Sequence, residues 1–129
     1  MQTIKFNRLN LSNEDFLLDM GCGEGRHSIG AHISTEANIL GFDLSFKDLK
    51  IAKERLNDFD TSQIETICQF ASANIISIPL SDSSLDAVIC SEVLEHVDSP
   101  EESIKELIRV LKPGGVLALS VPRYLPELI

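Results

Sequence analysis

The stretch FLLDMGCGEGRHSIG, residues 16–30, places three glycines between an apolar run and a segment with helical character. The apolar run ends at Met20, and Gly21, Gly23 and Gly25 follow. Glycine reaches positive φ without strain and has no Cβ to collide with a neighbour. In open α/β sheets, the first strand-to-helix turn is the place where the backbone comes close to a ligand. This turn therefore predicts a ligand site; the alternative interpretation is a tight turn without chemical meaning.

Further apolar runs follow at intervals along the chain, at residues 38–44, 64–72, 85–91 and 116–121. Short runs without strict alternation are typical of strands buried on both faces, as in parallel sheets. Because amphipathic segments separate the runs, the sequence predicts strands and helices that alternate through right-handed crossovers. The expected fold class is a doubly wound, Rossmann-like α/β domain with a mostly parallel sheet.

Two of the expected helices have recognisable starts. Ser45 is a candidate N-cap, and the apolar face of its helix should consist of Leu49, Ala52, Leu56 and Phe59. The last helix should begin after the candidate N-cap Ser99, with Pro100 at its first position and Glu102 completing a capping box. Its expected apolar stripe is Ile104, Leu107, Ile108 and Leu111, and the sequence KPGG should then end it.

Composition narrows the class of protein. With 129 residues and 43% hydrophobic content, the chain is expected to form one domain, residues 1–129. A net charge of −9 disfavours nucleic acid as a partner. The sequence contains neither a long apolar membrane span nor the apolar core of a signal peptide, so a cytoplasmic location is expected. The three cysteines, Cys22, Cys68 and Cys90, form no CxxC pair and are interpreted as reduced thiols.

The residues around the glycine turn indicate the chemistry of the ligand. The spacing is GxGxG, whereas a dinucleotide fingerprint needs GxGxxG, and Arg26 stands where the third glycine would be. Asp19 and Glu24 are poor neighbours for a phosphate and good neighbours for a cation. Asp43, at the end of the second expected strand, can accept hydrogen bonds from two ribose hydroxyls, or can simply be an acid at the start of a helix. The predicted ligand carries a ribose and a positive charge.

Four blocks of sequence resemble one family. LLDMGCGEGRHS, GFDLS, IPLSDSSLDAVICSEVLEHV and ELIRVLKPGGVLALSVP occur in the order found in class I S-adenosylmethionine-dependent methyltransferases, specifically methyltransferase type 11. The resemblance runs from about Leu17 to Pro122. It implies S-adenosyl-L-methionine as cofactor, S-adenosyl-L-homocysteine as product, and the strand order 3-2-1-4-5 for the strands present.

The same resemblance implies a set of cofactor-binding residues. Asp19 and the glycine turn would hold the methionine part, Asp43 the ribose, and Leu44 and Ile75 the two faces of the adenine. Asn74 stands where the family commonly has an aspartate that accepts from the adenine amino group; the alternative is an ordinary turn asparagine. The predicted cofactor-binding residues are Asp19, Gly21, Cys22, Gly23, Gly25, Asp43, Leu44, Asn74, Ile75 and Ser91.

The segment SEVLEHV supplies the candidates for catalysis. A general base is needed only if the acceptor atom carries a proton, and His96 and Glu92 are the candidates. The alternative for His96 is a histidine that packs under the edge of the sheet. No metal is expected, although Glu92, Glu95 and His96 have a spacing similar to the metal motif of small-RNA 2′-O-methyltransferases.

The resemblance implies a sheet of seven strands, and the apolar runs of this sequence are expected to supply the first five. A domain truncated after its fifth strand is therefore expected, with strands six and seven missing and a homodimer possible through the uncovered strand edge. The predicted function is methyl transfer to a small-molecule or lipid-linked acceptor. The alternatives are a non-catalytic domain that binds S-adenosylmethionine or S-adenosylhomocysteine, a fragment lacking the acceptor site, and a nicotinamide-dependent dehydrogenase.

Overall fold

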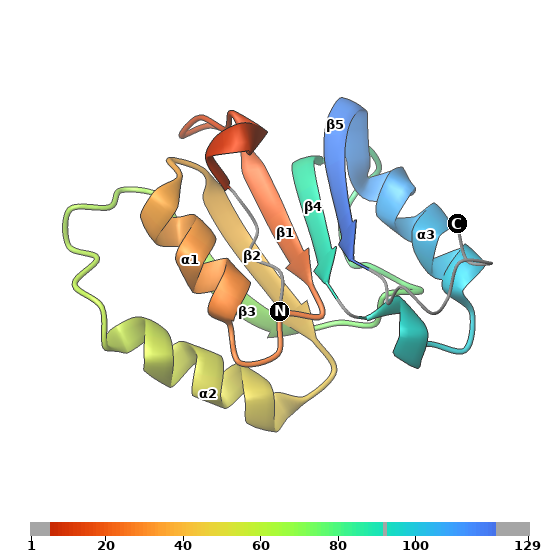
Figure 1. Ribbon diagram of the computed structural model, residues 1–129, viewed down its shortest axis with the longest axis horizontal. Helices are drawn as coiled ribbons and strands as arrows, with labels where there is room; N and C mark the ends of the chain where they lie inside the picture. Colours follow the sequence, from red (N-terminus) through yellow and green to blue (C-terminus); the bar gives the residue numbers. More distant parts are fainter. Residues whose placement is uncertain (1–5, 92, 121–129) are drawn as a thin grey trace.

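The computed structural model describes residues 6–91 and 93–120, and it contains one parallel sheet with the strand order β3-β2-β1-β4-β5 (Figure 1). The strands are β1 (Phe16–Met20), β2 (Asn38–Asp43), β3 (Cys68–Ser72), β4 (Leu85–Ser91) and β5 (Leu111–Ser120). The α-helices are α1 (Arg26–Ser34), α2 (Phe46–Asn57) and α3 (Pro100–Val110), and the short 3₁₀ helices are η1 (Phe6–Leu9) and η2 (Leu94–His96). The predicted fold class and strand order are confirmed.

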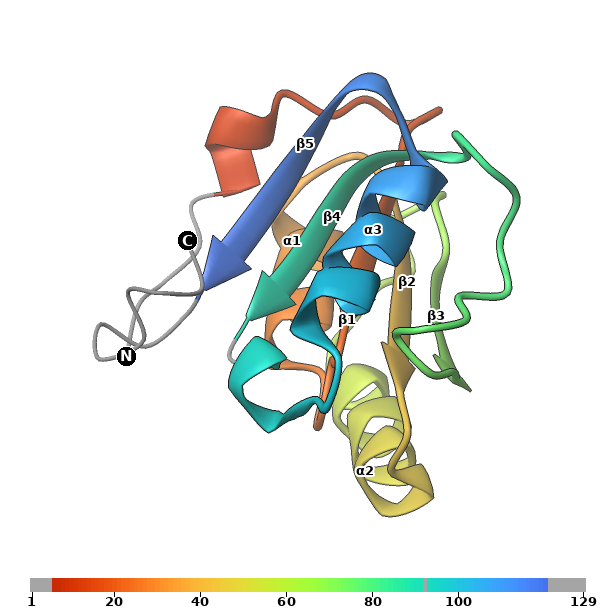
Figure 2. The same ribbon diagram turned by 90° about the vertical axis from the view of Figure 1, so that its right-hand side faces the viewer.

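Helices cover both faces of the sheet (Figures 1 and 2). Successive side chains of a strand point to opposite faces, so the neighbours Leu17 and Leu18 belong to two different cores. Leu18 packs on the side of α3, together with Leu107. Leu17 packs on the opposite side, together with Ala31 of α1. Burial on both faces explains why the strands are continuous apolar runs rather than alternating ones.

The start of α2 agrees with the sequence prediction, and its end does not. Ser45 caps the helix because its Oγ accepts a hydrogen bond from the Asp48 N–H at 3.2 Å. Leu49 and Ala52 are buried as expected. The prediction that Phe59 lies on the apolar face of this helix is wrong, because the helix ends at Asn57 and Phe59 is 47% exposed.

The predictions for α3 also need correction. Ser99 is the N-cap and Pro100 opens the helix, but the Ser99 side chain makes no capping hydrogen bond, so no capping box forms. The Ser99 carbonyl instead accepts from the N–H and the hydroxyl of Ser103. The buried face is Ser103, Leu107 and Val110, spaced by four and three residues. Ile108 lies one residue beyond that face and is 57% exposed.

Two strands differ from their predicted bounds. β3 begins at Cys68 rather than residue 64, since it pairs with β2 only from the register Ile39–Cys68 onward. β5 begins at Leu111, directly after α3, rather than at residue 116. The helix therefore ends at Val110, before KPGG, which lies in β5. Leu111, predicted on the apolar stripe of the helix, is instead the first residue of this strand. The register with β4 shifts between Leu85–Leu111 and Ala87–Val116, and Gly114 accommodates the irregularity with a φ of 83°.

Candidate functional site

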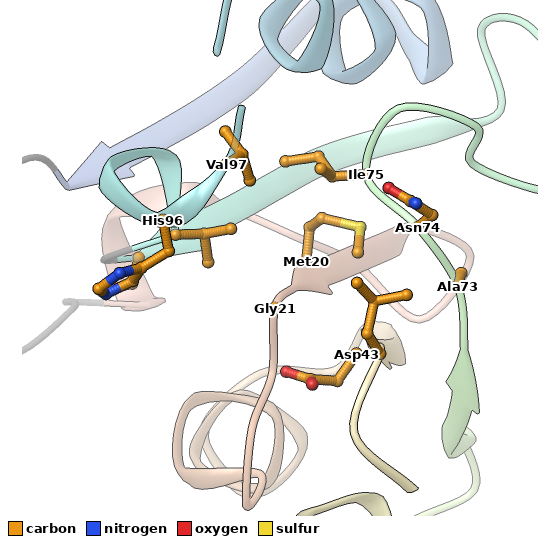
Figure 3. A pocket seen from close by; sticks show the side chains of 11 residues that line it. Met20, Gly21, Asp43, Ala73, Asn74, Ile75, His96 and Val97 are labelled. Atoms are coloured by element: carbon orange, nitrogen blue, oxygen red, sulfur yellow. The ribbon is translucent and has the colours of Figure 1, made fainter. Parts of the chain in front are cut away.

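The carboxyl ends of β1, β2 and β4 open into a cavity of about 450 Å³ (Figure 3). This volume lies in the range of small-molecule and cofactor sites. The topology explains the location, because the chain leaves the sheet in opposite directions on the two sides of β1. The structure brings six of the predicted cofactor-binding residues together around this cavity: Gly21, Asp43, Leu44, Asn74, Ile75 and Ser91.

Asp43 joins the end of β2 to the glycine turn. One carboxylate oxygen, Oδ2, accepts from the Gly23 N–H at 2.8 Å. The other oxygen, Oδ1, accepts from the Ser45 N–H at 2.9 Å, directly before α2. Each carboxylate oxygen has a second lone pair, and the residue lines the cavity. The side chain can therefore fix the turn and still accept hydrogen bonds from a ligand.

The glycines of the turn are required for different reasons. All three have positive φ: 78° at Gly21, 53° at Gly23 and 87° at Gly25. A Cβ on Gly25 would lie 2.9 Å from the Ala52 Cβ and 3.2 Å from the Phe70 ring, so this glycine allows α2 and β3 to pack closely. A Cβ on Gly23 would meet nothing within 4 Å. Close packing of the protein against itself thus explains part of the pattern that suggested a ligand.

Asp19 is buried beneath the turn and lines neither this cavity nor the neighbouring one described below. It is 2% exposed, and its Oδ2 accepts from the Ser28 hydroxyl at 2.7 Å. Burial raises the pKa of Asp19 from 3.8 to about 6, although hydrogen bonds from the Ser28 side chain and backbone oppose the shift. The direct contact between Asp19 and a ligand stays a prediction.

Asn74 forms a turn on the wall of the cavity that follows β3. Its Oδ1 accepts from the Ile76 N–H at 3.2 Å, and its carbonyl accepts from the Ser77 N–H at 3.0 Å. This geometry is that of a turn asparagine, the alternative interpretation. The amide oxygen retains a second lone pair, so a role toward an adenine amino group is compatible with the turn.

A second, more polar cavity of about 280 Å³ adjoins the first. The two share Gly21 and Ser91. Cys22 and four charged or titratable side chains complete the lining: Glu24, Arg26, His27 and Arg55. Since one cavity is mainly apolar and the other mainly charged, the combined site suits a ligand with an aromatic end and an ionic end.

The segment η2 forms the remaining wall. His96 lines the cavity with a side chain that is 77% exposed, which contradicts the alternative of a histidine packed under the sheet edge. In the view of Figure 3, His96 and Asn74 lie on opposite sides of Met20. Glu95, which precedes His96, has a side chain that is 13% exposed. The Oε2 atom of Glu95 is buried without a hydrogen-bond partner.

The third member of the metal pattern, Glu92, lies outside the described residues. Its predicted roles in catalysis and in metal binding therefore stay predictions. Within residues 6–91 and 93–120, no three His, Cys, Asp or Glu side chains gather in a way that could hold a metal ion.

The sequence analysis missed four residues that line the first cavity, Met20, Ala73, Val93 and Val97, and three that line the second, Arg26, His27 and Arg55. Met20 and Ala73 immediately precede predicted site residues at strand ends, so their positions carried a usable signal. Val93 and Val97 flank η2, where the apolar pattern shows no period. Val93 is also the reason that Gly21 cannot carry a side chain: an added Cβ would clash with its Cγ2.

Comparison with known proteins identifies the family. A family model described as a methyltransferase domain matches residues 18–119, which include the glycine turn, Asp43 and the wall of the cavity. The chain belongs to this methyltransferase family. S-adenosylmethionine is the cofactor of the family, in agreement with the predicted ribose-containing cationic ligand.

Curated relatives of this family member include enzymes with small-molecule acceptors in their names. This chain is 33% identical over 111 residues to the 27-O-demethylrifamycin SV methyltransferase of Amycolatopsis mediterranei, and the match covers 86% of this chain and 40% of that protein. It is 32% identical over 119 residues to the demethylmenaquinone methyltransferase of Listeria welshimeri, covering 91% of this chain and 48% of that protein. The chain thus spans less than half the length of these relatives.

Solved structures agree in fold. The crystal structure of the [4+2]-cyclase SpnF superposes with a TM-score of 0.78 at 29% identity, over 88% of this chain and 40% of that one. The name of that protein shows that this fold also carries other chemistry. In the described part of the chain, no helix combines the length and the apolar character that a membrane crossing requires.

Proposed function

We propose that residues 1–129 form a domain that binds S-adenosylmethionine in the cavity at the ends of β1, β2 and β4 and transfers its methyl group to a small-molecule acceptor. The observation that carries the proposal is the position of Asp43, whose carboxylate lines the cavity while holding the Gly23 N–H at 2.8 Å. A candidate acceptor for ribose hydroxyls and the glycine turn are thus fixed to each other within the matched family domain.

The cavity offers a distinct place for each part of the ligand. Leu44 and Ile75 supply apolar surface for the adenine, on elements that adjoin at the ends of β2 and β3. Asp43 accepts from the ribose. Ser91 and Gly21, which line both cavities, lie where the ligand passes from its nucleoside to its amino-acid part. The charged cavity then receives the ammonium and carboxylate groups.

The chemistry requires little of the protein beyond positioning. When bound, the sulfonium cofactor supplies an activated methyl group, whose bond to sulfur breaks with its electron pair left on sulfur as the acceptor atom attaches. The residues that line the two cavities align the acceptor with the methyl group and exclude water. Such alignment lowers the activation barrier by about 7 to 11 kcal/mol in well-oriented reactions. His96, exposed on the cavity wall, takes the proton of an acceptor that carries one.

Calorimetric titration with S-adenosylhomocysteine tests the cofactor proposal. The wild-type chain should bind, and Asp43→Ala should weaken binding roughly 10- to 100-fold because hydrogen bonds to a charged acceptor are lost. Asp98→Ala, which removes an exposed carboxylate outside the cavity, is the matched control. A folded wild-type chain that fails to bind, or that prefers NAD, would refute the proposal.

The alternative of a non-catalytic binding domain shares the cofactor and differs in turnover. Transfer of a radioactive methyl group to demethylmenaquinone or 27-O-demethylrifamycin SV would support the enzyme. Tight cofactor binding without transfer to any acceptor would support the binding domain. The cytoplasmic location stays a prediction.

A homodimer through β5 is retained as part of the proposal. β5 is an edge strand of the described sheet, and its Val116 and Leu119 are exposed apolar side chains. An exposed apolar edge favours pairing with another strand. Light scattering across a concentration series should show a dimer, and a monomer at every concentration would rule out this arrangement.

A further inference from the structure

Arg109, near the end of α3, binds the chain segment that connects β3 to β4. Its Nη2 donates to the Ile78 carbonyl and its Nη1 to the Leu80 carbonyl, both at 2.9 Å. Its Nε and Nη2 also donate to the two carboxylate oxygens of Glu106, one turn earlier on the same helix, at 2.7 and 2.9 Å. A fifth bond reaches the Asp82 carboxylate at 2.7 Å. The guanidinium therefore ties α3 to the connection by a forked, geometrically specific contact.

Glu106 completes the hold on the same segment. Its Oε2 accepts from the Ile78 N–H at 2.7 Å, so both backbone polar groups of Ile78 are bound by this one ion pair. The hydrogen bond from Arg109 holds the pKa of Glu106 below its usual value. The carboxylate is consequently ionised throughout the neutral range, and the contact does not depend on small changes of pH.

The bound segment is continuous with the cavity wall. Ala73, Asn74 and Ile75 line the cavity, and Ile78 follows after the turn closed by the Ser77 N–H and the Asn74 carbonyl. At the end of the segment nearest β3, the Ala73 N–H donates to the Asp43 carbonyl at 3.1 Å. Figure 2 shows the connection between β3 and β4 running beside α3. The wall is thus anchored on β2 at one end and on α3 at the other.

We propose that Glu106 and Arg109 are positioning residues that hold the adenine-side wall of the cavity in its binding conformation. This inference rests on the proposed binding of S-adenosylmethionine. Neither side chain lines the two cavities, so the pair acts through Ile78 rather than by touching the ligand. Without the pair, residues 74–77 sample more conformations. The affinity for the ligand then falls by the free energy needed to order these residues.

Two variants of the pair and two controls test this role. Arg109→Lys removes the fork, and Glu106→Gln keeps the shape of the side chain but loses its charge. Lys112→Met is the matched control, since it breaks the 3.1 Å ion pair with Asp86 outside the cavities. Asp82→Asn removes the negative charge of a side chain that is 79% exposed while leaving an oxygen that can accept from Arg109, so it should change little.

Titration with S-adenosylhomocysteine and hydrogen exchange should be measured on folded protein, checked by circular dichroism. We expect the Kd to rise roughly 3- to 30-fold in both variants of the pair and to stay near the wild-type value in the two controls. Without ligand, the amides of residues 74–78 should exchange faster in the variants of the pair, while those of β1 and β4 keep their protection.

A general structural role would lower protection throughout the sheet, so the local change distinguishes positioning from stability. Unchanged Kd values in the variants of the pair, with a wild-type chain that binds, would overturn the inference alone. Unchanged exchange at residues 74–78 would overturn it as well. A wild-type chain that does not bind S-adenosylhomocysteine would instead overturn the proposed function and, with it, this inference.

Discussion

Replacing Asp19 by asparagine should stabilise the protein at neutral pH. The Asp19 side chain is buried, and desolvation raises its pKa from 3.8 to about 6. Between these two values the folded state retains a proton that the unfolded state has lost. Stability therefore falls as the pH rises through this window and stays at the lower level above about pH 6.

The magnitude follows from the difference between the two pKa values. They differ by about two pH units, and each unit corresponds to about 1.4 kcal/mol. The ionised carboxylate thus costs about 3 kcal/mol of folding free energy at neutral pH. Asparagine has nearly the same shape and no charge, but its bond with Ser28 is weaker than a charge-assisted one. We expect a net gain of roughly 1 to 3 kcal/mol at about pH 7.5.

Urea denaturation of both proteins, followed by circular dichroism, measures this gain. The advantage of Asp19→Asn should shrink to below about 1 kcal/mol at about pH 4, where the folded wild type is itself protonated. Asp98→Asn, at an exposed position, is the matched control and should leave the free energy of unfolding nearly unchanged at about pH 7.5. Equal stabilities at neutral pH, or a difference that does not change with pH, would refute the reasoning from burial.

The same variant should bind the cofactor more weakly. The ionised Asp19 lies beneath the turn that faces the proposed sulfonium and ammonium groups, and negative charge there attracts a cation. S-adenosylmethionine should therefore lose more affinity than S-adenosylhomocysteine, whose sulfur is neutral. Equal losses for the two ligands would show that Asp19 shapes the turn without an electrostatic role.

Three further predictions concern the turn, the cavity wall and a buried thiol. In urea denaturation, Gly25→Ala should lower the free energy of unfolding by roughly 1 to 3 kcal/mol more than Gly23→Ala. Both glycines have positive φ, but only a Cβ at residue 25 would meet Ala52 and Phe70. Equal losses in the two variants would contradict the packing argument. His96→Ala should leave the Kd of S-adenosylhomocysteine within about twofold of the wild-type value and slow methyl transfer to a protonated acceptor about 100-fold or more. An unchanged rate of transfer would exclude His96 as the base. Burial raises the pKa of Cys90 to about 12, and its side chain is buried, so iodoacetamide should label it only after unfolding. Rapid labelling of Cys90 in the native chain would show that this thiol is accessible.

Local patterns in the sequence determined the architecture. Apolar runs identified the five strands found in the described residues, and Ser45 located the start of α2, because strand burial and capping depend on residues close in sequence. The glycine turn and Asp43 were found for the same reason, since each lies at the end of a strand. The family resemblance then supplied the strand order, which apolar patterns alone do not contain.

Only the tertiary structure decided what those residues contact. It showed that Gly25 makes room for Ala52 and Phe70, and that Asp19 is sealed beneath the turn rather than exposed in the cavity. It also joined Arg109 to Ile78, which lie 31 residues apart. Contacts of this kind depend on how α2, α3 and the sheet pack together. A sequence pattern specifies which face of an element is apolar, but not which distant backbone group a charged side chain on the other face will reach.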